Sequence, residues 1–131
     1  MKKNIIWVVD DDFIYQTIVK KLIQKAEVFT VQFSFVNGKE AITALKNTLA
    51  DSDNLPNIIL LDINMPIMDG WEFMEEFKKI KDKINQKINI YIVSSSIAIE
   101  DKKKAETYTE IKKYMTKPVS VDVLVDLTIQ E

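Results

Sequence analysis

Short apolar runs alternate with longer amphipathic segments along this chain, and no other sequence feature restricts its fold as strongly. Each run is short enough to form a strand, and the segments between the runs repeat apolar residues at helical spacing. The runs that predict strands cover residues 5–9, 29–36, 58–61, 88–93 and 111–116. Five strands that alternate with five helices indicate an α/β protein, in which helices cover both faces of a parallel sheet.

The pattern also distinguishes inner strands from edge strands. Run 5–9 is apolar throughout, as expected of a strand covered on both faces, whereas 29–36 alternates apolar and polar residues, as at a sheet edge. We expect a doubly wound, five-stranded parallel sheet of order 2-1-3-4-5, a flavodoxin-like arrangement, in one domain that spans residues 1–131. Residues 50–57 are polar and predict a loop.

The predicted helices differ in character. The apolar residues that predict the first helix are Ile14, Ile18, Leu22, Val19, Ile23 and Ala26. The aromatic residues that we expect in the core or packed on strands are Trp7, Phe29, Phe33, Phe35, Phe73 and Phe77. Residues 97–108 are rich in lysine and should form the most exposed helix, and Ser120 is suited to cap the last one.

Composition then excludes several classes of function. The 131 residues include no histidine, cysteine or arginine, which excludes histidine-based triads, thiol chemistry, disulfides and the usual zinc sites. The two glycines, Gly38 and Gly70, are too few for a Walker phosphate loop or a dinucleotide fingerprint. The net charge of −2 argues against nucleic-acid binding. The first apolar run is too short for a signal peptide or a membrane span, so we expect a cytoplasmic protein with no membrane contact.

Polar residues follow the predicted strands where parallel strands present their ligand-binding edge. Asp10-Asp11-Asp12 follow the first strand, Asp62 the third, Ser94-Ser95 the fourth and Lys117 the fifth. Carboxylates gathered at one edge repel each other and need a cation, and a set of oxygen ligands without histidine or cysteine favours Mg²⁺. Lys117 supplies a positive charge for an anion that shares the site with the cation. Together these groups suit the transfer of a phosphoryl group onto a carboxylate.

Four motifs in this order resemble the receiver domain of two-component response regulators. They are Asp10-Asp11, residues 61–70 (LDINMPIMDG), Val93-Ser94-Ser95 and residues 114–118 (YMTKP). The resemblance covers the whole chain, and the stretch 61–70 is its most specific part. It implies a signalling protein, not a turnover enzyme, in which Asp62 accepts a phosphoryl group from a histidine kinase or a phosphotransfer protein.

The resemblance also implies roles for the neighbouring residues. Mg²⁺ would be bound by Asp11, by Asp10 through water, by Asp62 and by the backbone carbonyl of Asn64. Lys117 and Ser94 would contact the phosphoryl oxygens.

The resemblance further implies residues for the conformational switch and for the lifetime of the phosphorylated form. Movement of Ser94 would be coupled to rotation of Tyr114, for which half-buried packing is an equally good reading. Asn64 and Ser96 would tune hydrolysis of the phosphorylated form. The Lys117-Pro118 peptide bond is expected to be cis, as the matching bond is in such domains.

Output is expected through protein contact, at the face formed by the fourth helix, fifth strand and fifth helix, because the chain closes soon after that helix with no output domain. The stretch 50–57 and the lysines at 102–104 and 112–113 depart from the family pattern and bear on the choice of partner. The lysines at 102–104 fit a solvated helix face better than a docking patch.

Simpler structural roles suffice for some of these residues. Asp12 is suited to cap the first helix, and Asp69-Gly70 is mainly turn geometry. Two other functions stay open: a receiver-like adaptor that is never phosphorylated, and a Mg²⁺-dependent phosphohydrolase of the haloacid dehalogenase type. The phosphohydrolase would need an aspartate where this chain has Asn64.

Overall fold

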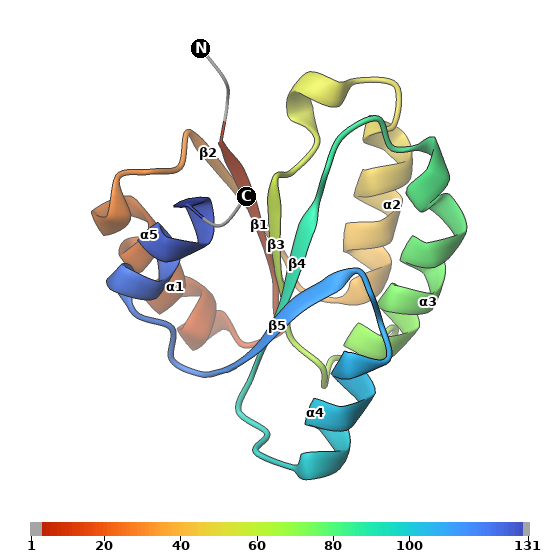
Figure 1. Cartoon of the computed structure of the whole chain (residues 1–131). Helices are drawn as coiled ribbons and strands as arrows, with labels where there is room; N and C mark the ends of the chain where they lie inside the picture. Colours follow the sequence, from red (N-terminus) through yellow and green to blue (C-terminus); the bar gives the residue numbers. More distant parts are fainter. Residues whose placement is uncertain (1–3, 130–131) are drawn as a thin grey trace.

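The five predicted strands form one parallel sheet in the order β2-β1-β3-β4-β5, as expected (Figure 1). The structure, a computed structural model, describes residues 4–129. The strands are β1 (Ile5–Val9), β2 (Val31–Phe35), β3 (Ile58–Leu61), β4 (Asn89–Ser94) and β5 (Ile111–Thr116). The helices are α1 (Phe13–Ala26), α2 (Gly38–Thr48), α3 (Gly70–Ile80), α4 (Ile99–Glu106) and α5 (Val121–Ile129).

Two apolar layers hold the helices on the sheet. In Figure 1, α1 and α5 lie on one face, and α2, α3 and α4 lie on the other. Residues of β1, β3 and β4 alternate between the layers: Trp7 and Ile59 pack with Phe73, whereas Val8 and Leu60 pack with Val19. All residues of these three strands are buried, in agreement with the continuous apolar sequence of β1 and β3 and the mainly apolar sequence of β4. The doubly wound α/β fold is thus confirmed.

Helix α1 buries a face that differs partly from the predicted stripe. Val19, Ile23 and Ala26 are buried as expected, but Ile14 and Ile18 are 75% and 45% exposed. Tyr15 and Gln16 take the inward positions instead, because they share a face with Val19 and Ile23.

Two other predictions need local corrections. Phe33 lies on the edge strand β2 and is 46% exposed, although Trp7 contacts its ring edge to face. Its place at the sheet edge explains this, because β2 has only one strand neighbour to pack beside it. The predicted loop 50–57 contains a short 3₁₀ turn, η1 (Ser52–Asn54).

Side-chain caps fix the starts of α1, α3 and α5. Asp12 accepts hydrogen bonds from the N–H groups of Ile14 and Tyr15, so its predicted capping role is confirmed. Ser120 accepts one from the N–H of Val123 near the start of α5. At α3, Asp69 forms a capping box with Glu72.

Gly70 is fixed by its close contact with the end of β3. A Cβ at this position would lie 2.4 Å from the carbonyl oxygen of Asp62, so only glycine allows α3 to start there. The Asp69-Gly70 pair is therefore structural, as expected, and it positions α3 directly against the backbone of Asp62.

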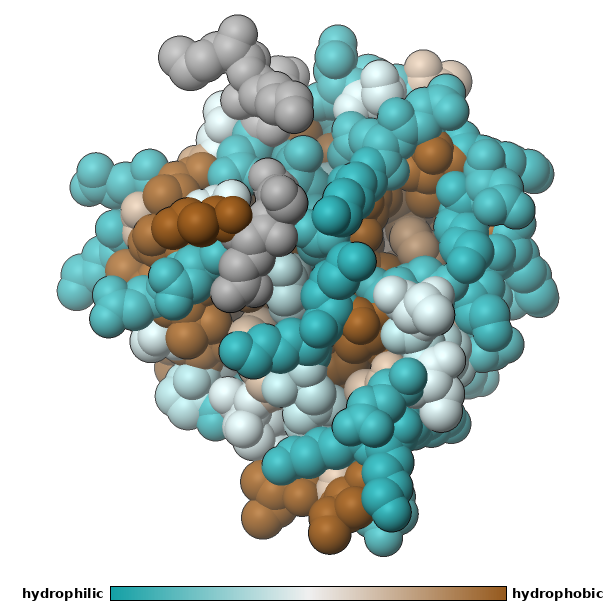
Figure 2. All heavy atoms as spheres, viewed as in Figure 1, coloured by the Kyte–Doolittle hydropathy of each residue, from teal (hydrophilic) through white to brown (hydrophobic). Residues whose placement is uncertain are grey.

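Helix α4 is the least buried helix, in agreement with its lysine-rich sequence. Within α4, all of which the structure describes, only Ala105 is buried, and the lysines at 102–104 are exposed. Figure 2 shows apolar surface at the end of the molecule where α4 begins; the exposed apolar side chains of this segment are Ile97 and Ile99. The Lys117-Pro118 peptide bond is cis, as predicted.

Candidate functional site

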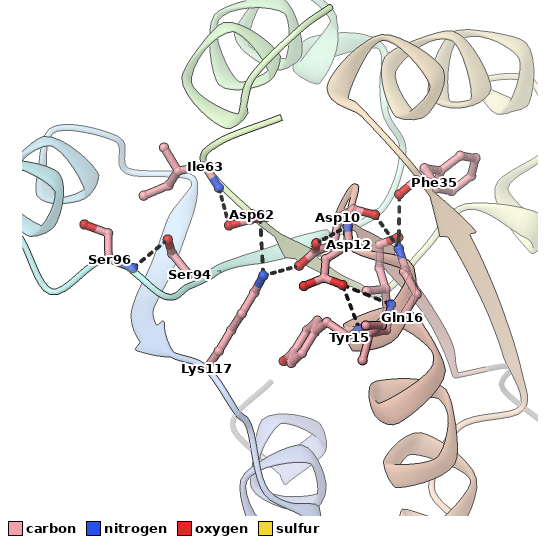
Figure 3. A network of polar contacts seen from close by, with 12 residues as sticks. Asp10, Asp12, Tyr15, Gln16, Phe35, Asp62, Ile63, Ser94, Ser96 and Lys117 are labelled. Carbon is pink, nitrogen blue, oxygen red and sulfur yellow. Dashed lines mark hydrogen bonds and ion pairs between the residues drawn. The ribbon is translucent and has the colours of Figure 1, made fainter. Parts of the chain in front are cut away.

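The polar residues that follow β1, β3 and β5 meet at one edge of the sheet (Figure 3). Lys117 reaches between two carboxylates: its Nζ lies 2.7 Å from Oδ2 of Asp10 and 3.4 Å from Oδ2 of Asp62. This convergence arises because β1 and β3 are neighbours and their carboxyl ends are in register, with Val9 paired to Leu61. The structure therefore brings together three groups that are 52 and 55 residues apart in sequence.

The two carboxylates are largely enclosed and partly held by backbone groups. Asp10 is 2% exposed and accepts a hydrogen bond from the N–H of Asp12. Asp62 is 7% exposed, and its Oδ1 accepts one from the N–H of Ile63. Each carboxylate is thus held by a backbone N–H close to its own strand end, in addition to its contact with Lys117.

Burial dominates the electrostatics of the cluster. It raises the pKa of Asp62 to about 6, with a further contribution from the negative charge of Asp10 and against the pull of Lys117. It also raises the pKa of Asp10, which the hydrogen bond from Lys117 opposes. Burial acts to lower the pKa of Lys117, but the hydrogen bond to Asp10 and the charge of Asp62 outweigh it and raise that pKa. The lysine therefore remains a cation, and Asp62 carries an energetically costly charge.

A third carboxylate completes a group with the geometry of a cation site. Ligand oxygens of Asp10, Asp11 and Asp62 lie within 4.8 Å of one another, and Asp11 is exposed to solvent. The cluster contains three carboxylates and one ammonium, so it has surplus negative charge that a hard divalent cation would balance. Asn64 follows in the adjoining loop with its side chain exposed.

The end of β4 contributes a buried hydroxyl and an ordered turn. Ser94 is 1% exposed, and its Oγ accepts a hydrogen bond from the N–H of Ser96. The hydroxyl of Ser96 donates a hydrogen bond to the carboxylate of Asp101 on α4. The backbone carbonyl of Ser96 accepts a hydrogen bond from the hydroxyl of Tyr114 on β5. Tyr114 is therefore tied to the turn that follows Ser94, which connects β4, α4 and β5.

Two residues at the edge were not predicted from sequence. The side-chain amide of buried Gln16 donates to the carbonyls of Val8, Asp10 and Phe35, which ties α1 to the ends of β1 and β2. The sequence did contain an indication of this role, because Gln16 is a polar residue on the same predicted helix face as the apolar Val19. The ring of Tyr15 lies 4.5 Å from Nζ of Lys117, and no sequence pattern indicated this contact.

Comparison with known proteins decides the family. A family model described as the response regulator receiver domain matches residues 6–128. The chain belongs to the response regulator receiver domain family. The resemblance of the four motifs is thereby confirmed.

Individual relatives of this receiver domain agree with the family match. The cell cycle response regulator CtrA of Brucella ovis is 36% identical over 122 residues, which are 93% of this chain and 47% of that protein. The sensor histidine kinase CheAY of Helicobacter pylori is 29% identical over 120 residues, 92% of this chain and 14% of that protein. The crystal structure of a two component response regulator from Cytophaga hutchinsonii has a TM-score of 0.89, with 29% identity and coverage of 99% and 97% of the two chains.

The receiver domain thus spans less than half the length of these two curated relatives. Receiver domains are the signalling modules of two-component systems, and the family match assigns this chain to that class. Among residues 4–129, no helix is long and apolar enough to cross a membrane.

Proposed function

We propose that this receiver domain accepts a phosphoryl group on Asp62 in a Mg²⁺-dependent reaction. The observation that carries the proposal is the position of the Lys117 ammonium between Asp10 and Asp62, at the edge where β1 and β3 end. The donor would be a histidine kinase or a phosphotransfer protein, whose histidine supplies the group that this chain lacks. Signalling through a receiver domain alone, without an output domain on the same chain, and a cytoplasmic location stay predictions.

The donor set of the site fits Mg²⁺. Asp10, Asp11 and Asp62 would hold the ion together with the backbone carbonyl of Asn64, all of them oxygen donors, which hard cations prefer. When bound, the ion supplies positive charge that neutralises the phosphoryl oxygens and lowers the cost of the buried carboxylates.

The chain's own residues orient and complete the transfer. A carboxylate oxygen of Asp62 forms a bond to phosphorus while the bond from phosphorus to the donor breaks, and the donor leaves with that electron pair. Acetyl phosphate as donor would give the acyl phosphate of Asp62 and acetate. Lys117 would move its hydrogen bonds to the phosphoryl oxygens, and the Ser94 hydroxyl would contact another of them.

The signal would pass from Ser94 to the turn that it supports. A Ser94 hydroxyl that turns toward the phosphoryl group would give up its hydrogen bond with the N–H of Ser96. Because Ser96 is hydrogen-bonded to Tyr114 on β5 and to Asp101 on α4, a movement of Ser96 would displace residues of both elements. A protein target would bind the face formed by α4, β5 and α5. Asn64 and Ser96 would set the lifetime of the phosphorylated form.

The test is intact mass after incubation with Mg²⁺ and acetyl phosphate. The wild type should gain one phosphoryl group, Asp62→Ala should gain none, and Asp126→Ala, an exposed aspartate on α5, should behave as the wild type. Removal of Mg²⁺ with a chelator should abolish the gain. The proposal fails if the wild type stays unmodified in excess donor, which would favour the adaptor, or if Asp62→Ala gains the same mass.

A further inference from the structure

The ammonium of Lys117 has three neighbours of two different kinds. Two are the carboxylates of Asp10 and Asp62, and the third is the ring of Tyr15, whose centroid lies 4.5 Å from Nζ (Figure 3). In the proposed reaction Asp62 becomes an acyl phosphate and Asp10 takes part in ion binding. The aromatic ring is therefore the one contact of the three that the chemistry leaves unchanged.

Tyr15 is well placed to act as a fixed support. It is the third residue of α1, and its N–H donates to the capping carboxylate of Asp12. Its side chain is buried in the apolar cluster that also contains Met115 and Val119, the residues two before and two after Lys117. The ring thus lies between α1 and the segment that carries the lysine, and packing on both sides holds it there.

The chemistry of the ring suits a cation that must not be neutralised. An aromatic face attracts an ammonium through its quadrupole and offers neither a proton acceptor nor a formal charge to compete with the phosphoryl group. Burial also raises the pKa of Tyr15, so the phenol stays neutral beside the lysine. The hydroxyl is not needed for this attraction, because a phenyl ring has the same negative face.

We propose that Tyr15 is a positioning residue for Lys117, whose ammonium its ring holds at the sheet edge when the carboxylate contacts are exchanged for phosphoryl oxygens. This inference rests on the proposed role of Asp62 as phosphoacceptor. It assigns the lysine a support that comes from the start of α1, next to Asp10 and Asp11.

The kinetic test uses the initial rate of phosphorylation by acetyl phosphate at saturating Mg²⁺ and donor. Tyr15→Leu, which keeps an apolar side chain but removes the ring, should be about 2- to 30-fold slower, the range expected for loss of a cation–π contact. Tyr15→Phe should restore the wild-type rate. Phe13→Leu removes an exposed aromatic side chain from the same helix and should change nothing.

A double-mutant cycle separates positioning from a general packing effect. In a Lys117→Gln background, Tyr15→Leu should cause no further loss of rate, because the ring acts through the lysine. An equal loss in both backgrounds, or a Tyr15→Phe variant as slow as Tyr15→Leu, would overturn the proposal. Circular dichroism checks the fold of each variant, and Tyr15→Met replaces Tyr15→Leu if the latter does not fold.

An NMR measurement decides the contact without any phosphorylation. The ε-methylene protons of Lys117, assigned by their loss in Lys117→Gln, should be shifted upfield by the ring in the wild type and in Tyr15→Phe, and unshifted in Tyr15→Leu. Unshifted protons in the wild type would refute the proposal. If the wild type takes up no phosphoryl group but shows the shift, the phosphoacceptor role fails and the contact between ring and lysine stands.

Discussion

Helices α3 and α4 each follow a strand that ends in a site residue, but they are held in very different ways. Helix α3 follows Asp62, begins with the Asp69–Glu72 capping box and buries a full apolar stripe. Helix α4 follows Ser94, and its N-cap residue Ala98 has no side chain that could cap the helix, although its N–H donates to the Oγ of Ser96. The acceptor side of the site is therefore built on a firmly packed element, whereas the hydroxyl side adjoins a weakly packed one.

What secures α4 is an aromatic arrangement near its C-terminal end. The ring of Tyr108 stacks on Trp71 of α3 at 5.9 Å, and its hydroxyl donates to Glu75. Lys104 and Lys78 lie over the Trp71 and Tyr108 rings, respectively. Tyr108 is itself buried, but it follows α4, and within the helix only Ala105 is buried. A helix held by so few buried side chains can rearrange at lower cost than one with a buried apolar stripe. The comparison teaches that the fold combines a rigid acceptor side with an adjustable turn after β4.

The largest difference should come from truncation of an apolar side chain in each helix. Phe73→Ala in α3 removes a fully buried ring and should lower the free energy of unfolding by about 3–5 kcal/mol. Ile99→Ala in α4 removes an exposed side chain and should change it by less than about 0.5 kcal/mol. Urea denaturation measures both. Similar losses for the two variants would contradict the comparison.

Substitutions of Asp62, which precedes α3, and of Ser94, which precedes α4, should affect the stability of the chain with different pH dependence. The folded-state pKa of Asp62 is raised from 3.8 to about 6, so between these values the folded chain binds a proton that the unfolded chain has released. Stability from this group is therefore present at low pH and lost as the pH rises through 6. In metal-free buffer at pH 8, Asp62→Asn should stabilise the chain by up to about 3 kcal/mol, with little effect near pH 4.

Two controls accompany this pH series. Asp126→Asn, at an exposed position, should show no such trend. Ser94→Ala removes a neutral group at the end of β4 and should give a loss that does not vary over this pH range. An Asp62→Asn variant less stable than the wild type at pH 8 would show that the charge of Asp62 carries no cost in the folded chain.

Substitutions at the N-caps of α3 and α4 should change the free energy of unfolding in opposite directions. Asp69→Ala removes the capping box of α3 and should cost about 1 kcal/mol in the free energy of unfolding. Ala98→Ser introduces a capping side chain at α4 and should gain about 0.5 kcal/mol, because the residue already has extended backbone angles. Hydrogen exchange of the α4 amides should slow in Ala98→Ser. Unchanged exchange would show that the start of α4 is already fixed by other groups.

The smallest effect should come from the hydroxyl of Tyr108. Tyr108→Phe keeps the stack on Trp71 and removes the hydrogen bond to exposed Glu75, which should cost about 0.5 kcal/mol. We expect the loss to appear as faster hydrogen exchange in α4, with the α3 amides unchanged. Equal acceleration in both helices would contradict the idea that this contact secures α4 alone.

Much of the fold could be predicted because local sequence patterns and general rules of chain connection determine it. The strands at 5–9, 58–61 and 111–116 were predicted with their observed bounds. For 5–9 and 58–61 the reason is that a short apolar run between polar segments leaves little choice of where the strand begins and ends. The burial of α1 was less predictable. Ile14 fits the apolar period as well as Tyr15 does, and only the way α1 packs on the sheet and α5 decides which of them faces inward.

The residues of the candidate site also fall into two groups, those that the sequence indicated and those that it did not. Residue type and position after a strand indicated Asp10, Asp62, Ser94 and Lys117, because parallel strands bring their carboxyl ends to one edge. The contact of Tyr15 with Lys117 and the three carbonyl contacts of Gln16 were not indicated. Such contacts depend on side-chain directions across elements, which periodicity alone does not contain.

The sequence by itself determined the α/β fold class, the strand order and the set of oxygen and ammonium groups available for chemistry. Its lack of histidine, cysteine and arginine left carboxylate, hydroxyl and lysine as the groups for the sheet edge. Only the tertiary structure decided how these groups meet. The lysine lies between two buried carboxylates, burial and mutual repulsion raise the pKa of Asp62, and α3 and α4 are held with different strength. These properties depend on distance and burial, which arise when segments far apart in the chain pack together.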